Sequence, residues 1–107
     1  MTSQVRDKLT AAERRHDDLM RLVSDPAVQA DPPTYRTHSK ALAELQPLVD
    51  GYGEYRRVED ELAQARDIAA SGDAELRAMA QEEIAGLESR LGPLAETLRQ
   101  LLIPKDP

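Results

Sequence analysis

The last third of the chain carries the clearest apolar repeat. Apolar residues recur there at alternating spacings of four and three, the pattern of a helix that packs lengthwise against other helices. The seam consists of Ala80, Ile84, Leu87, Leu91, Leu94, Leu98 and Leu101. Asp73 is placed to cap this helix and Pro104 to end it. The pattern predicts a helix over residues 73–102 that bends at Gly92-Pro93, because the repeat continues past both residues.

A first, shorter helix is predicted over residues 3–23. Ser3 can cap it, and the Pro26 ring ends it by restricting Asp25. Apolar residues follow a helical period on one side, and charged residues occupy the other. The inward positions are Val5, Leu9, Ala12, His16, Leu19 or Met20, and Val23.

A second helix is predicted over residues 32–70, starting after Asp31 as cap with Pro32 in its first turn. Its inward positions are Tyr35, His38, Leu42, Leu45, Leu48 or Val49, Tyr52, Tyr55, Val58, Leu62, Ala65, and Ile68 or Ala69. Pro47 removes one backbone hydrogen bond. Because the stripe continues on both sides of Pro47, we expect a kink there, with a break as the alternative.

The connections between these helices differ in length. Residues 25–33 hold three prolines and read as a turn-rich connection. Ser71-Gly72-Asp73 is a tight link, which requires the second and third helices to form an antiparallel hairpin. The predicted fold is therefore all-α. It is an antiparallel three-helix bundle with a long coiled-coil-like hairpin, and the first helix lies along the base of that hairpin.

Length and composition agree with this fold. A chain of 107 residues predicts a single domain over residues 1–107. Aromatic residues make up 3% of the chain, and the abundance of Leu, Ala, Glu and Arg is typical of packed helices. Cysteine is absent, which fits a reducing compartment, and no apolar run is long enough for a membrane span. We expect a cytoplasmic protein without membrane contact.

The charge argues against binding to free nucleic acid. The formal net charge is -6, which gives no basic surface of the kind that binds phosphates by counterion release. Residues 1–23 hold five basic and four acidic residues, whereas residues 72–107 hold four basic and seven acidic residues. This mild asymmetry is better explained by solvated mixed surfaces than by a polyanion-binding face.

No group of residues predicts catalysis, cofactor binding or a metal site. His16 and His38 lack a second ligand at metal spacing, so each is interpreted as a packing or boundary histidine. Adjacent carboxylates such as Glu82-Glu83 point in different directions on a helix. The serines lack a neighbouring base, and the three tyrosines share the apolar stripe, which favours a core role over base stacking. Gly51-Tyr52-Gly53 is interpreted as a weak spot in the helix.

Several strings resemble the N-terminal domain of bacterial class I peptide chain release factors. The closing segment, residues 101–107, is the most specific of them, and its Pro-Lys-Asp-Pro ending is closer to the factors that read UAA and UAG than to those that read UGA. The other matching positions are Asp25-Pro26, Val28, Asp31, Tyr35-Arg36, Ser39-Lys40, Leu45, Pro47, Tyr52, Tyr55, Glu75-Leu76, Ala80 and Glu82-Glu83. Ala41 departs from the pattern, since the family usually has an acidic residue there.

The resemblance implies an auxiliary role in translation termination. The family's Gly-Gly-Gln motif and codon-reading tripeptide lie beyond the matching region, so this chain is expected to be a non-catalytic fragment of a longer multidomain protein. The family's domain lies on the ribosome near the stalk base, with its ribosomal protein and rRNA, on the side of a GTPase release factor. From the hairpin geometry, the candidate contact is the tip. Its residues are Ala70, Ser71, Gly72 and Asp73, flanked by Arg66 and Arg77.

A second interpretation remains open from the residues alone. A leucine repeat serves equally in a stand-alone coiled-coil adaptor or oligomerisation module, whose seam pairs between chains rather than within one. Sedimentation at several concentrations separates the two, because a hairpin stays monomeric.

Overall fold

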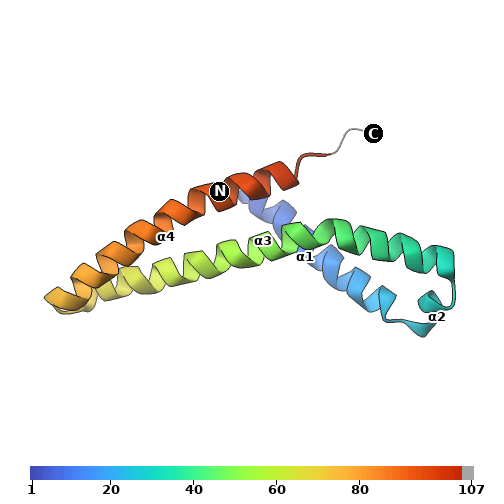
Figure 1. The fold of residues 1–107 in the computed structure, drawn as a ribbon, viewed down its shortest axis with the longest axis horizontal. Coiled ribbons are helices and arrows are strands. Elements are labelled where there is room, and N and C mark those ends of the chain that lie inside the picture. Colours follow the sequence, from blue (N-terminus) through green and yellow to red (C-terminus); the bar gives the residue numbers. More distant parts are fainter. Residues whose placement is uncertain (105–107) are drawn as a thin grey trace. The chain divides into compact units, whose positions relative to one another are not determined.

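Helices make up nearly all of the region that the structure describes. The computed structural model describes residues 1–104 and contains no strand in that range (Figure 1). The helices are α1 (Ser3–Val23), α2 (Pro26–Gln29), α3 (Pro32–Ser71) and α4 (Ala74–Leu101). The predicted all-α class and the three long helices are confirmed. The expectation that Lys105-Asp106-Pro107 begins a connection falls outside the described residues.

Two compact units divide the chain along α3. The first contains α1, α2 and the part of α3 up to Asp50, and the second runs from Gly51 to Gln100. Within the second unit the rest of α3 and nearly all of α4 form the predicted long hairpin. No helix in residues 1–104 combines the length and apolar character that a membrane crossing requires.

The N-cap of helix α1 lies one residue before the predicted cap, while the helix spans the predicted residues 3–23. The Thr2 side chain accepts a hydrogen bond from the Val5 backbone N–H at 3.2 Å, so Thr2 is the N-cap and Ser3 is the first helical residue. The prediction that Ser3 caps the helix is wrong. The hydroxyl groups of Thr2 and Ser3 could both serve as a cap, and the N-cap is Thr2, whose backbone is extended. The predicted inward positions Leu9, Ala12 and Leu19 are buried.

The connection after α1 contains a short helix, α2, which the turn-rich interpretation missed. Asp25 caps it by accepting a hydrogen bond from the Ala27 N–H at 2.9 Å, and Pro26 occupies its first position. The Gln29 side chain donates to the Val23 carbonyl at 2.9 Å, which ties α2 to the end of α1. Pro26, one of the three prolines that suggested turns, is therefore also compatible with the start of a one-turn helix.

Helix α3 runs without a break through Pro47, as the continuing apolar stripe predicted. Just before it, Gln46 donates to the Asp50 carboxylate at 2.8 Å, and its carbonyl oxygen faces the His16 Nε2 at 2.9 Å. Since an amide oxygen only accepts, Nε2 of His16 carries the proton. This half-buried histidine links α1 to α3, which agrees with the prediction of a packing or boundary residue.

The core of the second unit is the predicted seam between α3 and α4. Val58, Leu62, Ala65 and Leu87 form a buried cluster. Ile84, Leu91 and Leu94 pack against this cluster. Tyr52 and Tyr55 are also buried, as the core interpretation of these tyrosines predicted.

Two predicted core positions are wrong. Tyr35 is 40% exposed and Leu101 is 45% exposed, because each lies in a terminal helical turn, where neighbours cover fewer sides. In two of the three pairs of candidate positions one residue is exposed: Met20 beside the buried Leu19, and Ile68 beside the half-buried Ala69. In the third pair Leu48 is buried and Val49 is half-buried. Ala95 is buried although it lies beside the predicted repeat.

Gly51 has a packing role that the sequence interpretation missed. A Cβ atom at Gly51 would lie 2.9 Å from Cδ2 of Leu98, well inside van der Waals contact. Leu98 is 1% exposed, so α4 approaches the α3 backbone closely at this point. A glycine in mid-helix costs about 1 kcal/mol relative to alanine, and here the close approach accounts for its presence.

No close contact explains the glycines at positions 53 and 86, because nothing lies within 4 Å of a Cβ atom built at either position. We expect Gly53→Ala and Gly86→Ala each to raise the free energy of unfolding by about 0.5–1 kcal/mol through helix propensity. Urea denaturation followed by circular dichroism measures this change. Gly51→Ala is the matched comparison, and a similar gain there would contradict the packing explanation of Gly51.

Candidate functional site

The tip of the α3/α4 hairpin is a two-residue link held by backbone and side-chain hydrogen bonds. The Gly72 N–H donates to the Ile68 carbonyl at 2.7 Å, and the Ser71 hydroxyl donates to the Asp67 carbonyl at 2.8 Å. Asp73 caps α4 as predicted, since its carboxylate accepts from the Leu76 N–H at 2.9 Å. The tip is therefore a pre-formed surface.

Gly72 is required by close approach rather than by an unusual backbone angle. No glycine in residues 1–104 has a positive φ, so Gly72 does not adopt the left-handed conformation that often ends a helix. A Cβ atom at Gly72 would stand 2.8 Å from the Ile68 carbonyl oxygen and 3.1 Å from Cβ of Leu76. Backbone cannot move aside as the end of a side chain can. Gly72 therefore lets the two helices meet at the link.

The two arginines proposed to flank the tip have different environments. Arg66 forms an ion pair with Glu88 of α4, with 3.0 Å between Nη2 and Oε1. The Arg77 guanidinium has no carboxylate within ion-pair distance in the part of the chain that the structure describes. Arg77 is thus the cation of the predicted set that remains available to a partner.

A hollow lies beside Arg77 on one flank of the hairpin. It has a volume of about 280 Å³ and is lined by Ala69, Ala74, Arg77, Ala78 and Gln81. The small alanine side chains leave the space open, and Arg77 and Gln81, four residues apart, supply its polar edge. The structure thus joins one predicted residue, Arg77, to a depression that the sequence interpretation did not anticipate.

The opposite flank of the hairpin carries three exposed apolar side chains, Ile68, Leu76 and Met79. We call these three residues the apolar flank. Leu76 and Arg77 precede the buried seam residue Ala80 by four and three positions, so they lie on either side of it. The sequence pattern does not single out the apolar flank, because Ile68 and Ala69 are alternatives for one core position. Leu76 and Met79, apolar residues outside the seam, were the available signal.

The titratable side chains of residues 1–104 form no metal site. No three His, Cys, Asp or Glu side chains gather in residues 1–104 to hold a metal ion. The pKa of the exposed Glu96 carboxyl lies below its usual range because it accepts hydrogen bonds from Gln100 and Arg99. These bonds stabilise the fold above the ordinary carboxyl pKa and are lost as the pH falls through the lowered one.

Comparison with known families identifies the chain. The model of the PCRF domain matches residues 12–107. The chain belongs to the PCRF domain family. The resemblance to release factors seen in the sequence is thereby confirmed, and the helical hairpin described above is the structure of a PCRF domain.

Several curated proteins similar to this PCRF domain share one name. Proteins named peptide chain release factor 1 from Acidobacterium capsulatum and Bacillus subtilis are 43% and 42% identical to it over 94% of the chain. The chain spans 28% and 29% of the length of these two relatives. No solved structure matches it significantly.

Proposed function

We propose that this PCRF domain is the N-terminal, non-catalytic domain of a release factor that reads UAA and UAG. In this proposal it docks the factor on the ribosome during translation termination in the cytoplasm. The observation that carries the proposal is the 41–43% identity to proteins named peptide chain release factor 1 over nearly the whole chain. The absence of Gly-Gly-Gln from the 107 residues supports a non-catalytic role.

The docking surface proposed is the hairpin tip, residues 70–73, with Arg77 as its available cation. Its partners would be the ribosomal stalk base, with its protein and rRNA, and a GTPase release factor. The geometry supports the tip because its backbone is held by hydrogen bonds, so binding costs little ordering entropy. The adaptor alternative loses support because seam residues Leu87 and Leu98 are already buried within one chain.

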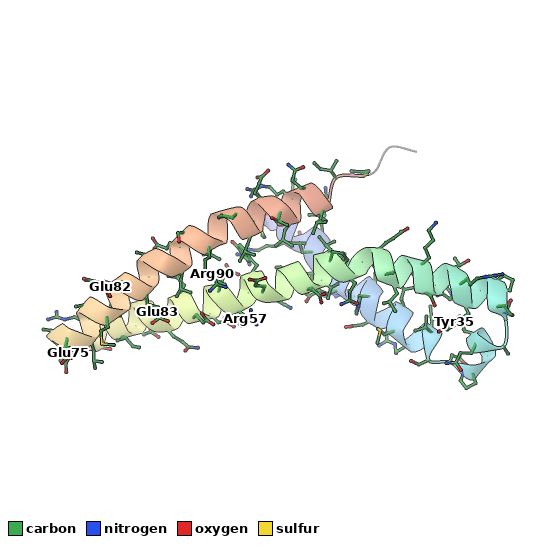
Figure 2. The ribbon with its side chains drawn as sticks, in the orientation of Figure 1. Tyr35, Arg57, Glu75, Glu82, Glu83 and Arg90 are labelled. Carbon is green, nitrogen blue, oxygen red and sulfur yellow. The ribbon has the colours of Figure 1, made fainter. Side chains whose placement is uncertain are left out.

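Binding of the chain to purified bacterial 70S ribosomes tests this function. We expect saturable co-sedimentation, and Arg77→Glu should weaken it roughly fivefold, which corresponds to about 1 kcal/mol. Arg66→Glu should weaken it as well, although this variant also breaks the pair with Glu88. Arg57→Glu, the same charge reversal at an exposed residue of α3 that lies farther from the tip, is the matched control (Figure 2).

Two results would contradict the proposal. If the wild-type chain does not sediment with ribosomes at any accessible concentration, the docking function itself is contradicted. Equal affinity of the Arg77→Glu and Arg57→Glu variants removes Arg77 from the docking surface, while leaving ribosome binding in place.

A further inference from the structure

The apolar flank is an exposed hydrophobic surface at the end of the second unit. Ile68 is 43% exposed, Leu76 48% and Met79 61%. Cγ2 of Ile68 lies 3.4 Å and Cβ of Leu76 lies 3.1 Å from the position of a Gly72 Cβ atom, so these two side chains lie together over Gly72. Met79 follows Leu76 by three positions on the same helix face. The three side chains form one patch rather than scattered apolar residues.

Three carboxylates of α4 lie around Met79, at the edge of this patch. Glu75 precedes Met79 by four positions, and Glu82 and Glu83 follow it by three and four, which are the positions of neighbours on a helix surface. Figure 2 shows these three glutamates along the tip half of α4. All three are exposed, and none has an ion-pair partner within residues 1–104. No lysine or arginine stands three or four positions from any of them.

The apolar patch and the carboxylates around it together indicate the chemistry of the partner. An exposed apolar patch marks a binding surface, and unpaired carboxylates around it repel phosphate groups while attracting cationic side chains. RNA is therefore disfavoured here, and a second copy of the chain would bring the same three carboxylates against these. A basic protein surface with an apolar pocket satisfies both the patch and its charged rim.

We propose that the apolar flank, Ile68, Leu76 and Met79, docks into an apolar pocket on a basic ribosomal protein, with Glu75, Glu82 and Glu83 pairing with cations at its rim. This inference rests on the proposed docking function and assigns one flank of the tip to protein rather than rRNA. Met79, the most exposed of the three, is the anchor, and its flexible thioether adapts to the pocket.

Affinity for purified 70S ribosomes tests the assignment. Met79→Glu should weaken binding about tenfold or more, because it places a charge in the apolar contact. Gln64→Glu, the same added charge at an exposed position of α3, should have little effect. Glu82→Lys combined with Glu83→Lys should also weaken binding, whereas an rRNA contact would be strengthened by it. Circular dichroism of each variant verifies the helical fold.

The outcomes separate this inference from the proposed function. If the wild type binds ribosomes and Met79→Glu binds equally well, the docking function stands and the apolar flank is overturned. Tighter binding of the Glu82→Lys, Glu83→Lys variant also overturns it in favour of RNA. Self-association of the wild-type chain that Met79→Glu abolishes overturns it in favour of a second copy. If the wild type does not bind ribosomes, both proposals fail.

Discussion

Leu98→Ala is expected to lower the free energy of unfolding by about 2–5 kcal/mol, the range for truncating a fully buried leucine. Leu98 is 1% exposed, and its Cδ2 atom lies against the α3 backbone at Gly51. Truncation removes these contacts and leaves a cavity that two long helices can close only partly. Urea denaturation of the purified chain measures the loss, and Leu101→Ala, at a 45% exposed position, is the control.

The same contact predicts a compensating substitution. In the wild type, the helix-propensity gain of Gly51→Ala, about 1 kcal/mol, is opposed by the 2.9 Å approach of Leu98 Cδ2. In the Leu98→Ala background that atom is gone, so the added methyl group also fills part of the cavity. The double-mutant cycle should therefore show a favourable coupling of roughly 1 kcal/mol or more. An equal effect of Gly51→Ala in both backgrounds would show that the two residues do not constrain each other.

Val58→Asp is expected to have the largest effect on the second unit, a loss of more than about 4 kcal/mol. Val58 is fully buried in the cluster with Leu62, Ala65 and Leu87, and the core of residues 1–104 contains no buried polar or charged residue that could pair with a carboxylate. The substitution should abolish cooperative thermal unfolding of the hairpin.

The adjacent Arg57→Asp serves as the control for Val58→Asp, because it introduces the same side chain at an exposed position of the same helix. Arg57→Asp should lower the free energy of unfolding by much less than Val58→Asp does. A stable, cooperatively unfolding Val58→Asp variant would contradict the burial of this seam.

The apolar period was sufficient to predict the helices and most of the core. A side chain such as Val58 or Leu87 is buried because its helix face meets another helix, and that face follows from the spacing alone. Continuity through Pro47 also followed, because the stripe on both sides outweighs one missing backbone bond. Tyr35 and Leu101 fit the stripe equally well but lie in terminal turns, and periodicity does not specify where the neighbouring helix ends.

The candidate site was less predictable because it depends on contacts across the link. The tip followed from Gly72 and Asp73, whose types indicate a helix end and a helix start. That Arg66 pairs with Glu88, 22 positions later, depends on the register between α3 and α4, which sequence spacing does not fix. The apolar flank does not follow from periodicity either, because the stripe leaves open whether Ile68 or Ala69 faces the core, and the structure exposes Ile68.

The most direct test of docking through the tip is site-directed photocrosslinking to purified 70S ribosomes. A benzophenone amino acid replaces Met79, which keeps the position apolar, and the same group at Gln64 is the control. We expect crosslinks from position 79 to a basic ribosomal protein, and few from position 64. Crosslinks from position 79 to rRNA, or a yield no higher than that from position 64 while the chain is bound, would contradict the account.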